Sequence, residues 1–218
     1  MRHRTREHSA GMAFSTTHAI RRTSWLAALL ALLLGGCSFD LGSWSPGADK
    51  DVQPKPAQPA PEISAKDISD AQDVAVQGRT FARSGKTEEA LAAFNKALAL
   101  DPYNAQALYG RGLIYQGEKQ HQQAIEDFSS AHGLTPQHAE PLVGRAISYL
   151  ALDKVKEAAA DLDEAVQADP NSAAAWSNRG LAYERLGDKA KAAASYSRAV
   201  ALRPRDDVAR NGLARVGG

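Results

Sequence analysis

Three histidines close together in the sequence are the residues best suited to metal binding or acid–base chemistry. His121, His132 and His138 lie in one short stretch, and imidazole nitrogens are common metal ligands and proton carriers. The step of 11 residues from His121 to His132 is not a helical ligand spacing, and no cysteine lies nearby. We therefore expect these histidines to be surface residues and not metal ligands.

No other group of residues forms a recognisable catalytic pattern. Asp161, Asp163 and Glu164 are close in sequence, but such acidic residues fit solvated helix faces or ion pairs. The sequence has no glycine-rich phosphate loop, no Gly-x-Ser-x-Gly motif and no His-Glu-x-x-His motif. We therefore expect no enzymatic activity, no cofactor and no small-molecule substrate.

The single cysteine, Cys37, follows a segment with the features of an export signal. Arg21 and Arg22 precede ten consecutive apolar residues, 25–34, which is too short to span a bilayer and suits the apolar part of a secretory signal. The segment Leu34-Gly35-Gly36-Cys37 resembles the lipobox of bacterial lipoproteins. The resemblance implies that residues 1–36 are removed and that Cys37 is acylated, with palmitate among the added chains. The alternative is a free thiol just past an ordinary signal peptide.

The residue after the cysteine indicates which of the two bacterial membranes would hold the protein. In the lipoprotein family an aspartate at this place favours the inner membrane of Gram-negative bacteria, so Ser38 implies the outer membrane, facing the periplasm. The inner membrane remains the alternative. Met1 and Met12 are both possible start residues.

Composition excludes several classes of partner and site. The chain has 218 residues and a formal net charge of +1, but arginines are concentrated in the first 36 residues and the remainder is slightly acidic. This gives no electrostatic footprint for nucleic acid. One cysteine excludes an internal disulfide framework and any multi-cysteine metal site. Residues 37–67 are rich in proline and have no apolar period, so we expect a disordered tether between anchor and domain.

From 71 to 206 one pattern of small and large residues recurs four times at a period of 34 residues. Counted from residues 71, 105, 139 and 173, the recurring positions are 4, 8, 11, 15, 20, 24, 27 and 32. The copies carry, in order, Val74, Gly78, Phe81, Gly85, Ala90, Phe94, Ala97 and Pro102; Leu108, Gly112, Tyr115, Lys119, Ala124, Phe128, Ala131 and Pro136; Leu142, Ala146, Tyr149, Asp153, Ala158, Leu162, Ala165 and Pro170; Trp176, Gly180, Tyr183, Gly187, Ala192, Tyr196, Ala199 and Pro204.

This spacing predicts a pair of helices in each copy. Positions 4, 8 and 11 share one face of a first helix, and positions 20, 24 and 27 share one face of a second. Small residues at 8 and 20 allow close approach, and large residues at 11 and 24 fill the gaps. The proline at position 32 ends the second helix.

The pattern resembles the tetratricopeptide repeat (TPR) family. The resemblance implies an all-α fold over 68–218, a right-handed α-solenoid of four helix-turn-helix repeats. Their expected bounds are 71–104, 105–138, 139–172 and 173–206. A short capping helix over 207–216 follows, with Val208 and Leu213 covering the last repeat.

Two columns of the repeat vary together. Position 7 holds Gln77, Arg111, Arg145 and Arg179, and position 23 holds Ala93, Asp127, Asp161 and Ser195. Both copies with aspartate also carry arginine. We therefore predict structural ion pairs between Arg111 and Asp127 and between Arg145 and Asp161. The competing hypothesis is a basic ladder for phosphate or an anionic polymer.

The inner wall of such an array consists of positions 2, 5, 6, 9, 12 and 13 of each first helix. These positions are basic in the first copy, apolar in the middle copies and polar in the last, which suits an extended segment or amphipathic helix of a partner. Some of the apolar residues could instead pack one repeat against the next. The predicted groove residues are Arg79, Arg83, Tyr109, Leu113, Val143, Ile147, Leu150, Asn178 and Arg185.

Some TPR proteins bind chaperone tails through a carboxylate clamp. The matching places here hold Ala75, Arg79, Gly110, Glu140 and Gly144. Because Glu140 would repel a terminal carboxylate where the clamp needs a cation, we do not expect this function.

The architecture resembles bacterial TPR lipoproteins of the NlpI type. It implies a lipid-anchored scaffold or adaptor that binds envelope proteins, such as protease or cell-wall hydrolase complexes, through its concave groove. One alternative is a pilotin-like assembly factor for a pilus or secretion system. Another is a mainly structural spacer whose groove is unused.

Overall fold

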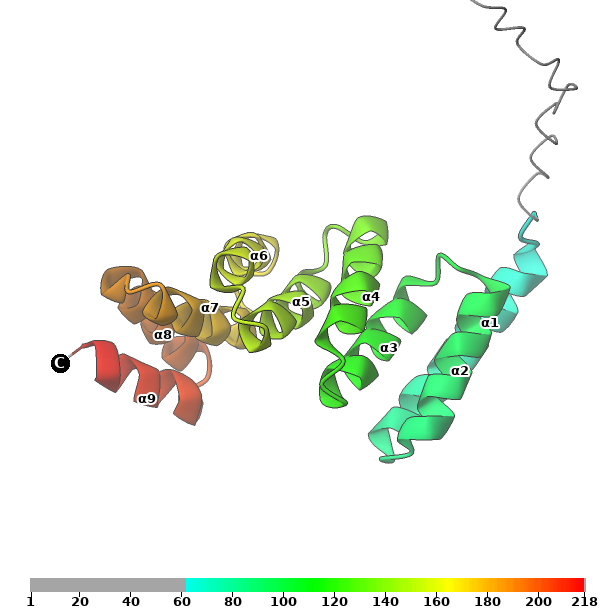
Figure 1. The fold of residues 1–218 in the computed structure, drawn as a ribbon, viewed down its shortest axis with the longest axis horizontal. Coiled ribbons are helices and arrows are strands. Elements are labelled where there is room, and N and C mark those ends of the chain that lie inside the picture. Colours follow the sequence, from blue (N-terminus) through cyan, green and yellow to red (C-terminus); the bar gives the residue numbers. More distant parts are fainter. Residues whose placement is uncertain (1–61, 218) are drawn as a thin grey trace, which may run out of the picture. The chain divides into compact units, whose positions relative to one another are not determined.

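The computed structural model describes residues 62–217. This part of the chain contains nine α-helices and no β-strand (Figure 1). The predicted signal peptide, Cys37 and most of the predicted tether lie outside the described residues. The helices are α1 (Ala65–Arg83), α2 (Thr87–Leu100), α3 (Ala105–Gly117), α4 (His121–Leu134), α5 (Ala139–Ala151), α6 (Val155–Ala168), α7 (Ala173–Arg185), α8 (Lys189–Leu202) and α9 (Asp207–Val216).

The helices form a stack of hairpins. Each helix packs against the next one in the chain, and each odd-numbered helix also contacts the following odd-numbered helix, from α1 to α9. Even-numbered helices make no such contact with one another within the described residues. The odd helices therefore share one face of the stack, which we call the odd-helix face. This confirms the predicted all-α solenoid with a short capping helix. None of the described helices has the length and apolar content needed to cross a bilayer.

The turn inside each hairpin has the same backbone conformation in all four copies. Gly85 and Gly187 have φ of 73° and 80°, and Lys119 and Asp153 have φ of 62° and 60°. A left-handed residue after a helix satisfies its last carbonyl groups. The non-glycine residues adopt the conformation at a cost of about 1–2 kcal/mol each, so the repeat geometry overrides the preference of the residue.

The core of each hairpin matches the predicted packing. Ala90, Ala124, Ala158 and Ala192 are all fully buried, at 0% exposure. The large residue at position 24 is also buried in every copy; these residues are Phe94, Phe128, Leu162 and Tyr196.

Glycines on two helices flank each aromatic ring at position 24. A Cβ at Gly78 or at Gly110 would lie 2.8 Å or 2.3 Å from the ring of Phe94. The same arrangement holds for Phe128 with Gly112 and Gly144, and for Tyr196 with Gly180 and Gly212. The glycine at position 8 comes from the same repeat and the one at position 6 from the next, so the ring holds three helices together.

The capping helix α9 covers the last repeat through its small residues. Ala209, Gly212 and Val216 are buried. Val208 is 60% exposed, so the expectation that it covers the repeat is wrong. It fails because the face of α9 that meets α7 and α8 is the face with Ala209 and Gly212, one step further along the helix.

Candidate binding groove

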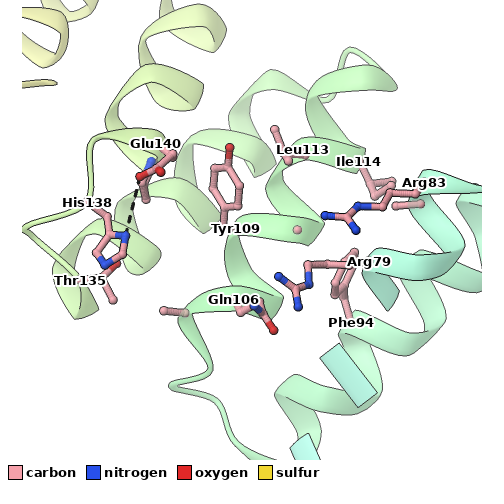
Figure 2. Close-up of a pocket in the computed structure, with 14 residues that line it drawn as sticks. Arg79, Arg83, Phe94, Gln106, Tyr109, Leu113, Ile114, Thr135, His138 and Glu140 are labelled. Atoms are coloured by element: carbon pink, nitrogen blue, oxygen red, sulfur yellow. Dashed lines mark ion pairs between the residues drawn. The ribbon is translucent and has the colours of Figure 1, made fainter. Parts of the chain in front are cut away.

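A cavity of about 630 Å³ lies on the odd-helix face, between α1, α3 and the start of α5 (Figure 2). We call it the groove cavity. Its walls differ in charge and polarity. The lining residues are Arg79, Ala82, Arg83, Phe94, Ala105, Gln106, Tyr109, Gly110, Leu113, Ile114, Thr135, His138, Glu140 and Pro141.

The α1 wall of the groove cavity is basic. Arg79 and Arg83 are exposed and lie one helical turn apart, so their side chains share one face of α1. Figure 2 shows both guanidinium groups extending into the cavity. No carboxylate among residues 62–217 forms an ion pair with either of them. This wall therefore presents donors that the described part of the chain leaves without an anionic partner.

The floor is apolar. Leu113 is 43% exposed, and Ile114 beside it is half-buried. Because Gly110 has no side chain, the ring of Phe94 reaches the cavity beneath it. The exposed leucine offers a contact surface for an apolar side chain of a ligand.

The α5 wall is acidic. Glu140 is exposed, and its Oε2 lies 3.8 Å from Nδ1 of His138. Tyr109 is half-buried between this wall and the floor, with its ring 5.8 Å from that of Phe128. Burial raises the pKa of the Tyr109 hydroxyl, and the charge of Glu140 raises it further. Tyr109 therefore remains a neutral donor and acceptor at the edge of the cavity.

A second, smaller cavity adjoins the first. It has a volume of about 430 Å³ and shares Arg79, Ala105 and Gln106 with the groove cavity. Val76 and Tyr103 line it and are 46% and 68% exposed. The odd-helix face thus continues past Arg79 towards further exposed apolar side chains.

Only the first four predicted groove residues meet in one cavity; they are Arg79, Arg83, Tyr109 and Leu113. Val143 and Ile147 are half-buried and do not line it, and Val143 packs against the core. Asn178 donates to the carbonyl of Ala174, one turn back in its own helix.

Leu150 and Arg185 serve the contact between repeats instead. Leu150 is 7% exposed and belongs to the core, so its assignment to the groove is wrong. Its carbonyl accepts a hydrogen bond from Nη1 of Arg185 at 2.8 Å, and Nη2 of Arg185 donates to Asp153 at 2.7 Å. The following odd helix covers position 12, so a large apolar residue there becomes core.

The two ion pairs expected from the columns are present. Arg111 donates from Nε and Nη2 to Asp127 at 2.8 and 2.7 Å, and Arg145 donates in the same way to Asp161 at 2.8 Å for both bonds. Both aspartates are buried. The aspartate in each pair raises the pKa of its arginine. These guanidinium groups lie against even-numbered helices, which does not fit a basic ladder open to a ligand.

Each of these arginines has a second partner that sequence reasoning missed. Nη1 of Arg111 donates to Asn95 at 2.8 Å, and Nη1 of Arg145 donates to Ser129 at 3.0 Å. Arg179 binds Asp163 at 2.6 Å in the same register. The partner is always 16 residues earlier, at position 25 of the preceding repeat. The only signal in the sequence is that position 25 is polar in every copy.

The three histidines lie in α4 and directly before α5. No group of three or more potential ligands comes together within residues 62–217. His138 is exposed, but His121 and His132 are half-buried, and their Nδ1 atoms are buried without a hydrogen-bond partner in that range. The expectation that all three are surface residues is therefore wrong for these two, because their side of α4 is partly covered.

Comparison with protein families gives three matches. Tetratricopeptide repeat models match residues 105–138 and 143–207, and a TPR repeat model matches residues 78–119. Together they cover more than half of the chain. No curated protein matches the sequence.

Several solved structures share the fold. The first TPR domain of Spaghetti (RPAP3), solved with the HSP90 peptide SRMEEVD, is 26% identical, with a TM-score of 0.51 over 52% of this chain and 90% of that chain. PilF of Pseudomonas aeruginosa is 24% identical, with a TM-score of 0.62 over 68% of each chain. MamA of Desulfovibrio magneticus RS-1 is 23% identical, with a TM-score of 0.61 over 72% of this chain and 86% of that chain.

Proposed function

Because the chain belongs to the tetratricopeptide repeat family, whose members are generally protein-interaction scaffolds, we propose that it is an adaptor that captures a segment of a partner protein in the groove cavity. The observation that carries the proposal is a cavity of about 630 Å³ that has an exposed leucine, an acidic wall and two arginines that form no ion pair within residues 62–217. A similar TPR domain, that of RPAP3, holds a peptide in its solved structure.

We further propose that the adaptor works at the bacterial cell envelope. Cys37 would carry the lipid, and the domain would face the periplasm from the outer membrane. Several acyl chains anchor a protein stably where one chain does not. Residues 38–61 would then give the groove cavity reach over neighbouring envelope proteins, such as a protease or a cell-wall hydrolase complex.

Quantitative affinity capture tests the proposal. The full chain and its Leu113→Glu variant are used as baits in envelope extracts, and captured proteins are compared by mass spectrometry. Leu186→Glu is the matched control, because Leu186 is 39% exposed, close to the 43% of Leu113, and lines neither cavity.

We expect at least one envelope protein to be captured by the wild-type chain and the control and lost from the Leu113→Glu variant. Equal capture by all three baits would contradict a role for the groove cavity. The structural-spacer hypothesis predicts this equal result. A captured set made up of pilus or secretion-system subunits would favour the assembly-factor alternative instead.

A further inference from the structure

We propose that the groove cavity selects an acidic–apolar peptide segment and holds it in one orientation, with its acidic end over α1 and its apolar side chains over α3. This inference rests on the proposed function and specifies the chemistry of the partner segment.

The positive charge on the α1 wall has no anionic partner within residues 62–217. Arg79 and Arg83 together carry ten N–H donors, and they form no ion pair within residues 62–217. This distinguishes them from the arginines of the other odd helices, which bind carboxylates of the same chain. Those arginines are Arg111, Arg145, Arg179, Arg185, Arg210 and Arg215. A carboxylate of a ligand would pair with this wall without displacing an internal bond.

Glu140 places a negative charge at the opposite end of the cavity from the arginines. The carboxylate of Glu140 is 65% exposed at the α5 wall. Glu140 lines the cavity together with Tyr109, and its charge adds to the burial that raises the pKa of Tyr109. An acidic residue placed here would be repelled, whereas the same residue over Arg79 and Arg83 would be attracted. The two walls therefore fix the orientation of an acidic segment.

The distance across the floor, from α1 to α5, sets the length of the segment. Neighbouring packed helices lie about 8–10 Å apart, so α1 to α5 spans about 20 Å. An extended peptide covers about 3.3 Å per residue, which gives a segment of about six residues. Leu113 and Ile114 lie between the walls and would contact apolar side chains in its middle.

These features favour a peptide over a polyanion. A nucleic acid or an anionic lipid surface would bring negative charge to Glu140 as well as to α1. Neither would cover Leu113 with apolar groups that match a narrow floor. An acidic–apolar peptide would pair with the α1 wall, cover the floor and keep its negative charge away from Glu140, with a single change of residue type along its length.

The test uses a phage-displayed library of random dodecapeptides. The full chain, purified in detergent, is the target, and peptides that also bind the Leu113→Glu variant are removed. We expect the enriched peptides to share one or two acidic residues next to apolar residues. Synthetic fluorescein-labelled copies should bind the double variant Arg79→Glu, Arg83→Glu about tenfold more weakly or worse. The control double variant Lys156→Glu, Arg198→Glu has the same net charge and exposed sites outside the cavity, and should bind within about twofold of wild type.

The outcomes separate the two proposals. Enriched peptides that are neutral or basic, or an affinity that the Arg79, Arg83 reversal leaves unchanged, would overturn the acidic–apolar specificity and leave the groove function intact. A failure to enrich any peptide that depends on Leu113 would overturn both. Circular dichroism of each variant checks that its helical content equals that of the wild-type chain.

Discussion

Gly110 of α3 lies directly against the ring of Phe94 of α2, and a Cβ at Gly110 would come within 2.3 Å of Cζ of that ring. The contact joins two repeats and also forms part of the floor of the groove cavity. The third copy shows the alternative solution, in which the smaller Leu162 occupies the place of the ring and Ala146 and Asn178 occupy the places of the two glycines. Residue size at these three positions is therefore matched across the hairpin and its successor.

Substitution of Gly110 tests this contact. Gly110→Ala should lower the free energy of unfolding by about 1–3 kcal/mol, because the ring must move to accept the methyl group. Gly133→Ala is the control, since nothing lies within 4 Å of that position in α4. It should raise stability by about 0.5–1 kcal/mol through helix propensity. The measurement is urea unfolding followed by circular dichroism, and a stabilising effect of both substitutions would contradict the packing described above.

The buried ion pairs give a second prediction. Arg145→Met leaves the carboxylate of Asp161, 10% exposed, without its partner. We expect the free energy of unfolding to fall by about 2 kcal/mol or more, which lies between the effects of breaking an exposed pair and a buried pair. The double variant Arg145→Met, Asp161→Leu should recover most of it. Asp70→Asn, which removes an exposed pair with Lys66, should change stability by less than about 0.5 kcal/mol. An equally small effect of Arg145→Met would show that the pair is not structural.

The contact between the last repeat and the cap should depend on pH. Arg215 donates to both carboxylate oxygens of Glu184, and the hydroxyl of Tyr196 donates to one of them. Hydrogen bonds from Arg215 and then Tyr196 lower the pKa of Glu184 below its usual value of 4.5. A lowered folded-state pKa contributes stability above the unfolded pKa, and that contribution is lost as the pH falls through the folded pKa.

Thermal unfolding between pH 7 and pH 3 checks this dependence. Glu184→Gln should lower the melting temperature at pH 7, and the difference from wild type should shrink as the pH falls below about 4.5. A difference that stays constant down to pH 3 would mean that ionised Glu184 does not support the cap.

The lipid anchor is tested in cells. We expect an alkyne analogue of palmitate to label the wild-type chain and not Cys37→Ser, because Cys37 is the only cysteine. The wild-type chain should fractionate with membranes and the variant should not. An unlabelled, soluble wild-type chain would favour the ordinary signal peptide, and labelling of the variant would mean that the lipid is attached to another residue.

The sequence alone predicts the fold because the repeat gives four residues that can be compared at each position. The glutamine and alanine of the first copy, Gln77 and Ala93, stand where the next copies have arginine and aspartate. That joint change identifies the pairs of Arg111 and Arg145 without a structure. The residue types of the second partners differ; these partners are Asn95, Ser129 and Asp163. They are found only in the structure, where each of α3, α5 and α7 packs against the even helix before it as well as the one after it.

The groove is harder to predict from the sequence. Helix periodicity shows which residues share a face, but it does not show whether that face meets solvent or the next repeat. Position 12 faces the inner side, yet in the second, third and fourth copies it contacts the following odd helix. Gln116 donates to the carbonyl of Gly144 and to Ser148, Leu150 is core, and Glu184 binds Arg215. Gln116 and Leu150 therefore join repeats, and Glu184 joins the last repeat to the cap. Whether a residue at position 12 is exposed depends on the spacing between neighbouring odd helices, and that spacing is set by the packing of the whole array.

Photocrosslinking in living cells tests the central claim most directly. A photoreactive amino acid replaces Leu113 in one strain and Leu186 in another, and crosslinked products are identified by mass spectrometry. The groove adaptor predicts a discrete crosslinked envelope protein from Leu113 and none of it from Leu186. The same product from both positions, or no product from Leu113, would contradict it.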